Sequence, residues 1–149
     1  MDADASAVTI AGSDACVAPR LLWADAYDDS EGGPGIQEDD TLVLAFDLGT
    51  NGYTGAISSA LLVPGSWGAV TGAWSQSTAA DDTFTITFGA GAHDVAEGDI
   101  VAVAPGCIKD DGENVNAFGA VPIWGDFGSD YDDPSSVITI TAHPMRLAC

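Results

Sequence analysis

A run of carboxylates near residue 130 is the part of this chain best suited to chemistry. The run has the form Asp126-x-x-x-Asp130-x-Asp132-Asp133, and glycines beside and within it give the backbone freedom to turn. Hard cations bind several oxygen atoms from nearby loop positions, so calcium is the cofactor that this spacing could hold. The favoured interpretation is a solvated acidic surface that keeps the protein in solution, with calcium binding as the alternative.

Two further acidic loops are weaker calcium candidates. They are Asp110-Asp111-Gly112-Glu113-Asn114 and Asp28-Asp29-x-Glu31. Neither these loops nor the first run matches the EF-hand, which needs a Glu at its twelfth position.

Enzymatic chemistry is not expected. The chain has two histidines, His93 in a turn and His143 before a proline, and both are expected at the surface. No Gly-x-Ser-x-Gly elbow is present, and no phosphate-binding Gly-x-x-x-x-Gly-Lys loop. Paired carboxylates are frequent, but they cluster in turns rather than in a predicted cleft.

The charge balance excludes several partners. The chain has 23 acidic and 3 basic residues in a length of 149, a formal net charge of −20. Nucleic acids and anionic membranes both require Lys and Arg, so binding to either is not expected. No apolar run is long enough for membrane insertion. Hydrophobic residues make up 46% of the chain, which is enough for one folded domain.

Alternation of apolar and polar residues predicts an all-β fold. In Thr83–Phe88 the residues Phe84, Ile86 and Phe88 share one face. The other predicted strands are 5–11, 21–27, 41–46, 57–63, 70–75, 99–104, 117–124 and 137–141. Turns rich in Gly, Asp and Pro separate them, which favours an antiparallel β-sandwich, with a closed barrel as the alternative.

One pattern resembles a known family. Residues 33–46 read Gly-Pro-Gly-Ile-x-x-x-Asp-Thr-Leu-x-Leu-x-Phe, and Trp74 leads to the strand at 83–88 and to Glu97-Gly98-Asp99. Over residues 20–128 the chain resembles immunoglobulin-like domains repeated in acidic surface proteins of microbes and algae. The resemblance implies an immunoglobulin-like sandwich at the cell surface or outside the cell. The antibody-type disulfide around a core Trp is not evident.

The N-terminal segment resembles the donor arm of pilus-like fibril subunits. The strand-like run at 5–11 precedes a hinge formed by Gly12, Ser13 and Asp14. In such subunits the arm completes the sheet of another subunit by strand addition. The resemblance divides the chain into an arm (1–15) and a single domain (16–149). The predicted donor strand consists of Ala7, Val8, Thr9, Ile10 and Ala11. Alternatively, this run is the first strand of its own sandwich.

The cysteines and tryptophans add two further expectations. Counting alternate strands from Cys16 returns the chain to the same pole near Cys107, which favours a Cys16–Cys107 disulfide, although Cys149 could replace either partner. Among four tryptophans, Trp67 follows Pro-Gly-Ser and is expected to be exposed, where it could bind a glycan.

Two functions follow from these patterns. The first is a structural subunit that forms an extracellular homopolymer by donating Ala7–Ala11 to another copy, with Val8 and Ile10 filling its groove. The second is a calcium-stabilised adhesion or carbohydrate-binding module of a larger surface protein.

Overall fold

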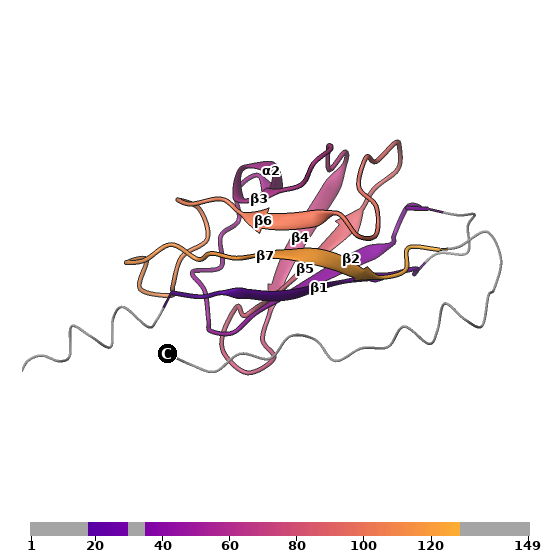
Figure 1. Ribbon diagram of the computed structural model, residues 1–149. Helices are drawn as coiled ribbons and strands as arrows, with labels where there is room; N and C mark the ends of the chain where they lie inside the picture. The colour runs from indigo at the N-terminus through magenta and orange to yellow at the C-terminus, as the bar shows by residue number, and fades with distance from the viewer. Residues whose placement is uncertain (1–17, 30–34, 129–149) are drawn as a thin grey trace, which may run out of the picture.

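The computed structural model describes residues 18–29 and 35–128, and the regular secondary structure in this part of the chain is almost entirely β-strand (Figure 1). The predicted all-β architecture is therefore confirmed. The elements are β1 (Leu21–Tyr27), β2 (Thr41–Phe46), α2 (Ile57–Ala60), β3 (Leu61–Leu62), β4 (Val70–Ser75), β5 (Thr83–Phe88), β6 (Ile100–Val103) and β7 (Ala120–Gly125).

The seven strands form one curled mixed sheet in the order β3-β6-β7-β1-β2-β5-β4. Five of the six pairings are antiparallel, whereas β1 and β7 run parallel. The prediction of an antiparallel arrangement did not include this parallel pair. Figure 1 shows β6 and β7 in front, with β2, β5 and β4 passing obliquely behind them. The sheet therefore faces itself across the core.

The core follows the alternation seen in the sequence. Phe84, Ile86 and Phe88 of β5 are buried, and the threonines between them are half-buried on the outward face. The same period buries Leu42 and Leu44 of β2. Apolar side chains from the other half of the sheet and its loops complete the cluster; they include Leu61, Trp67, Val95, Val101, Ile108, Val121, Ile123 and Phe127.

The predicted strand at 57–63 is wrong in its first half. Residues Ile57–Ala60 form a single helical turn, and strand β3 holds only Leu61 and Leu62. The turn is closed by the Leu61 N–H, which donates to the Ile57 carbonyl. One turn is too short to produce a helical period in the sequence. The other predicted strands at 21–27, 41–46, 70–75, 83–88, 99–104 and 117–124 match observed strands to within three residues at either end. Those at 5–11 and 137–141 lie outside the described residues.

Two glycines at the ends of β7 allow it to lie against β1. Gly125 pairs with Ala26 and has φ +89°, and a Cβ there would lie 2.4 Å from the Ala26 carbonyl oxygen. Gly119 has φ +127°, and a Cβ there would lie 3.1 Å from the backbone nitrogen of Leu21. Only glycine combines this backbone conformation with so close an approach.

We expect Gly125→Ala to destabilise the protein more than Gly98→Ala. Gly98 has a similar φ of +91°, but a Cβ added there would have no neighbouring atom within 4 Å. Both variants carry the left-handed strain of about 1–2 kcal/mol. Only Gly125→Ala also forces β7 away from β1, which adds about 1–3 kcal/mol. Urea denaturation measures the difference; equal losses would contradict the steric role of Gly125.

Candidate functional site

Most of the predicted site residues lie outside the described residues. These are the donor strand Ala7–Ala11, the hinge Gly12–Asp14, Cys16, and the carboxylates Asp130, Asp132 and Asp133. The donor strand, the disulfide and the calcium site therefore stay predictions. Only Cys107 and Asp126 can be placed.

Asp126 fixes a turn in the part of the chain that is described. Its Oδ1 accepts the Gly128 N–H at 2.8 Å, and its side chain is half-buried just after β7. Within residues 18–29 and 35–128, no three His, Cys, Asp or Glu side chains gather as a metal site would need.

The second acidic loop uses its first carboxylate on its own backbone. Oδ1 of Asp110 accepts the N–H groups of Asn114 at 2.6 Å and Val115 at 2.8 Å. These two hydrogen bonds, with that of Val115 the stronger, hold the pKa of Asp110 below its ordinary value. Asp110 therefore closes the loop in its ionised form.

Asp82 is a buried carboxylate that organises the turn between β4 and β5. It accepts N–H groups from Ser77 and Thr78 at 2.7 Å and from Ala79 at 2.8 Å, together with the Thr83 hydroxyl at 3.0 Å. Burial alone would raise the pKa of Asp82, but these hydrogen bonds together lower it. The native turn therefore holds Asp82 as an anion.

Cys107 lies half-buried beside the segment that precedes α2. Its thiol donates to the Ser59 carbonyl at 3.7 Å, and residues 18–29 and 35–128 contain no second cysteine that could pair with it. A hydrogen bond with this thiol, and then burial, raises the pKa of the Tyr53 phenol. Tyr53 is therefore neutral at ordinary pH.

The expected exposure of Trp67 is wrong. The side chain is 4% exposed, and its indole N–H donates to the Leu61 carbonyl at 2.8 Å. His93 is likewise half-buried rather than at the surface: Nδ1 lies 2.8 Å from the Trp67 carbonyl oxygen and Nε2 2.7 Å from that of Gly89. Both partners are backbone carbonyl oxygens, so the ring is held between segments 67–68 and 89–90. These side chains have structural roles in the core.

Sequence reasoning missed a groove of about 360 Å³ beside the edge strand β4. Strand β4 forms one wall, and segment 53–57 forms the other. No lining residue is charged, although the chain has 23 acids; the lining residues are Tyr53, Thr54, Gly55, Ala56, Ile57, Val70, Thr71, Gly72, Ala73, Trp74 and Phe84. No local signal in the sequence identifies it, because Val70–Ser75 shares its absence of charge with every described strand except β1.

Two aromatic rings in tilted contact form part of the lining of this groove. The Trp74 and Phe84 ring centroids lie 4.6 Å apart, and the Trp74 indole N–H donates to the Tyr53 carbonyl at 2.7 Å. A Cβ on Gly72 would lie 2.1 Å from the Phe84 ring, so the missing side chain lets that ring lie across β4. The groove therefore combines an aromatic surface with an uncharged lining.

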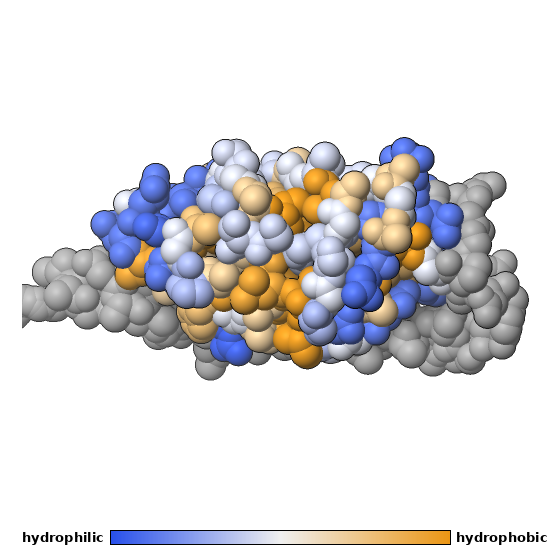
Figure 2. Space-filling model, turned by 90° about the horizontal axis from the view of Figure 1, so that it is seen from above, coloured by the Kyte–Doolittle hydropathy of each residue, from blue (hydrophilic) through white to orange (hydrophobic). Residues whose placement is uncertain are grey.

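The face that carries α2, β3 and β6 shows hydrophobic surface in its middle and hydrophilic surface at both ends (Figure 2). Leu62 and Ile100, on neighbouring strands, are about half exposed at 50% and 47%. Among the helices described, none has the length and hydrophobicity needed to cross a bilayer. No family model, no curated protein and no solved structure matches this chain.

We expect Asp82→Asn to destabilise the protein by about 1–3 kcal/mol at neutral pH, because it removes charge-assisted hydrogen bonds to three N–H groups. Folding lowers the pKa of Asp82, so its ionised carboxylate stabilises the folded protein at pH values above the unfolded-state pKa, near 3.9. This stabilisation is lost as the pH falls through the lower pKa of the folded state. The difference between variant and wild type should therefore shrink below about pH 4. Thermal denaturation from pH 7 to pH 2 measures it.

Asp111→Asn is the matched control, because Asp111 is exposed and the change in net charge is the same. A pH-independent difference for Asp82→Asn, or an equal effect of Asp111→Asn, would contradict the role given to Asp82.

Proposed function

We propose that this chain is an immunoglobulin-like structural subunit of an extracellular pilus-like fibril. Each subunit donates Ala7–Ala11 as a β-strand to another copy, and Gly12–Asp14 is the hinge of the arm. The arm joins a domain in which a Cys16–Cys107 disulfide fixes its base. Copies of the same chain are therefore the partners.

The strand order supports the immunoglobulin-like part of the proposal. Such sandwiches place strands A, B, E and D in one sheet and C, F and G in the other. The observed order β3-β6-β7-β1-β2-β5-β4 corresponds to C-F-G-A-B-E-D in chain order. The parallel β1–β7 pair then joins the two sheets along one side.

The single observation that carries strand donation is the position of the first strand. The A position of the sheet is filled by β1, Leu21–Tyr27, and not by residues 5–11. A second strand-like run therefore precedes a domain that already has its first strand. Strand addition to another copy uses this run through main-chain hydrogen bonds and alternate side chains.

We expect deletion of residues 1–13 to abolish polymerisation of the full chain. A synthetic peptide spanning Asp4–Gly12 should bind the truncated protein. Val8→Asp with Ile10→Asp in the peptide should weaken binding about 100-fold or more, because a carboxylate in an apolar groove loses its hydration. Electron microscopy of the protein and titration calorimetry of the peptide are the measurements.

Thr9→Asp in the peptide is the matched control, since Thr9 points to the opposite face of the strand. A full chain that stays monomeric at every concentration, or a truncated chain that polymerises as well as the full chain, would overturn strand donation.

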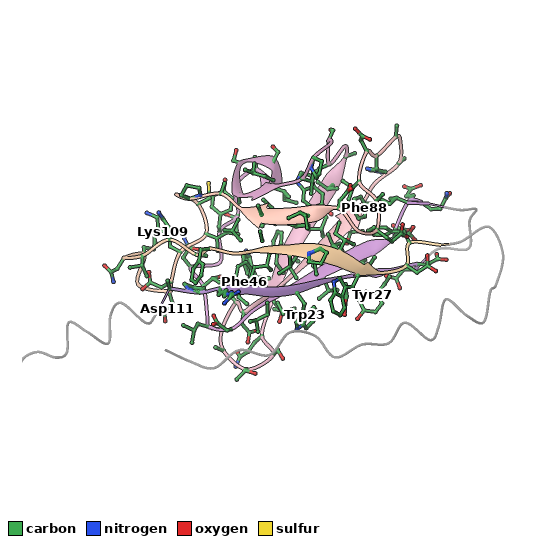
Figure 3. The ribbon with its side chains drawn as sticks, in the orientation of Figure 1. Trp23, Tyr27, Phe46, Phe88, Lys109 and Asp111 are labelled. Carbon is green, nitrogen blue, oxygen red and sulfur yellow. The ribbon has the colours of Figure 1, made fainter. Side chains whose placement is uncertain are left out.

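Carbohydrate binding is a second candidate, favoured by aromatic side chains on the outward face of β1. Trp23 and Tyr27 are four residues apart on the strand and share this face, as Figure 3 shows. On the neighbouring strand β7, Trp124 is the pairing partner of Asp25 of β1. The Tyr27 side chain is 47% exposed. Burial, then the Asp25 and Asp29 carboxylates, raises the pKa of Tyr27, so its hydroxyl stays available as a donor.

If this second candidate is right, Tyr27→Ala should lower the affinity for a soluble neutral oligosaccharide about ten-fold. Phe118→Ala is the control, because Phe118 is 44% exposed and lies outside the strands. Tryptophan fluorescence titration is the measurement. An unchanged spectrum up to about 10 mM sugar would remove this candidate.

A further inference from the structure

The described sheet has two edge strands, and they differ in how well they are protected. Edges are normally guarded by short length, charge, proline or a bulge. Strand β3 has only two residues, Leu61–Leu62. Strand β4 has six, reads Val-Thr-Gly-Ala-Trp-Ser, and pairs with β5 in unbroken register. It therefore lacks all four protections.

The hydrogen-bonding pattern shows which backbone groups of β4 face the open edge. The Gly89 N–H donates to the Ala69 carbonyl at 2.8 Å, while the Phe88 N–H donates away from β4, to the Asp40 carbonyl. Because antiparallel pairs alternate, the groups of Thr71, Ala73 and Ser75 face β5. The N–H and C=O groups of the intervening residues, Val70, Gly72 and Trp74, then face outward. Within the described residues, no backbone group forms a hydrogen bond to these outward groups from the open side of β4.

The groove beside this edge can hold alternate side chains of an added strand. Segment 53–57 forms the opposite wall, so the strand would lie along the mouth of the groove with its apolar side chains directed inward. Trp74 and Phe84 offer them an aromatic surface. Tyr53, which also lines the groove, is neutral, so the whole lining is uncharged.

We propose that the open edge of β4 is the acceptor for Ala7–Ala11 of a second copy. This inference rests on the proposed function and adds the surface that receives the donated strand. Val8 and Ile10 enter the groove, Thr9 faces solvent, and the backbone pairs with the outward groups of β4. Five residues match the length of the six-residue edge.

Charge argues for this occupant. Two copies that each carry −20 repel one another, so contact is favoured only where both surfaces lack acids. Nine consecutive uncharged residues, 5–13, lie between Asp4 and Asp14. The β4 groove is the matching uncharged surface on the acceptor.

Hydrogen exchange of the full chain, before and after polymerisation, tests the assignment. In the polymer, the amides of Val70, Gly72 and Trp74 should exchange about 100-fold more slowly than in the monomer. The amides of Thr71 and Ala73 already bond to β5 and should change far less, which gives an internal control. Dissolving the quenched polymer and recording NMR spectra resolves single amides.

Two variants test the same edge by function. Ala73→Lys places a charge on the exposed edge and should slow polymerisation at least about ten-fold. Ala96→Lys, an exposed position away from β4, makes the same change in charge and should not. Val70→Pro removes one outward N–H at the first position of the strand, where proline is tolerated, and should act like Ala73→Lys.

The outcomes separate this inference from the proposed function. Polymerisation that needs residues 1–13 but leaves the three outward amides fast would overturn the β4 assignment and keep strand donation. Amides that are already slow in dilute monomer, and become fast on deletion of 1–13, would assign the edge to the arm of the same chain. If slow exchange of these three amides instead depends on residues 137–141, that segment of the same chain occupies the β4 edge. Either result overturns acceptance of a second copy.

Discussion

The fold depends on the parallel contact between β1 and β7. Without it, the halves β3-β6-β7 and β1-β2-β5-β4 would be separate sheets, each with one more open edge. The contact is close because Ala24 and Ala26 are small and buried, and because Gly119 and Gly125 supply backbone that other residues rarely adopt. Because β1 is hydrogen-bonded to a strand on each side, the longer strand that remains at an edge of the sheet is β4. The candidate site is therefore a result of how the sheet closes elsewhere.

The acidic composition has a structural use as well as an electrostatic one. Asp carries a short carboxylate that reaches N–H groups two to five residues away, which the longer Glu side chain does less well. Asp82, Asp110 and Asp126 each close a turn in this way, and Asp40 accepts the N–H groups of Asp29 and Gln37 while fully buried. Carboxylates that serve the backbone are already occupied by donors. This explains why acid-rich loops, which suggest cation binding in a sequence, are structural in the described part of the chain.

What the sequence predicts well here is local. Period-two alternation identifies β2 and β5 and their buried faces, because each residue's environment is set by its neighbours two positions away. The parallel direction of β7 beside β1 depends on contacts about a hundred residues apart, and no local pattern encodes it. Trp67 follows a turn motif yet is buried, because its partner is the Leu61 carbonyl. The β4 groove was missed for the same reason: Val70–Ser75 reads as a strand, but its place at the end of the sheet is a property of the whole fold.

The distribution of acids within the domain has one more consequence. Asp25 is the only acid within the seven described strands; the other described acids lie in the connections, at the ends of the sheet. Between these ends, the outward face of the strands carries hydroxyl groups instead. For example, Thr71 of β4, Thr87 of β5 and Thr41 of β2 are paired in register. In the described part of the chain the charge is therefore uneven, with the acids at the ends of the sheet and uncharged strands between them. Dissolved salt should therefore screen the repulsion between two such ends more than the repulsion between the sides of two sheets.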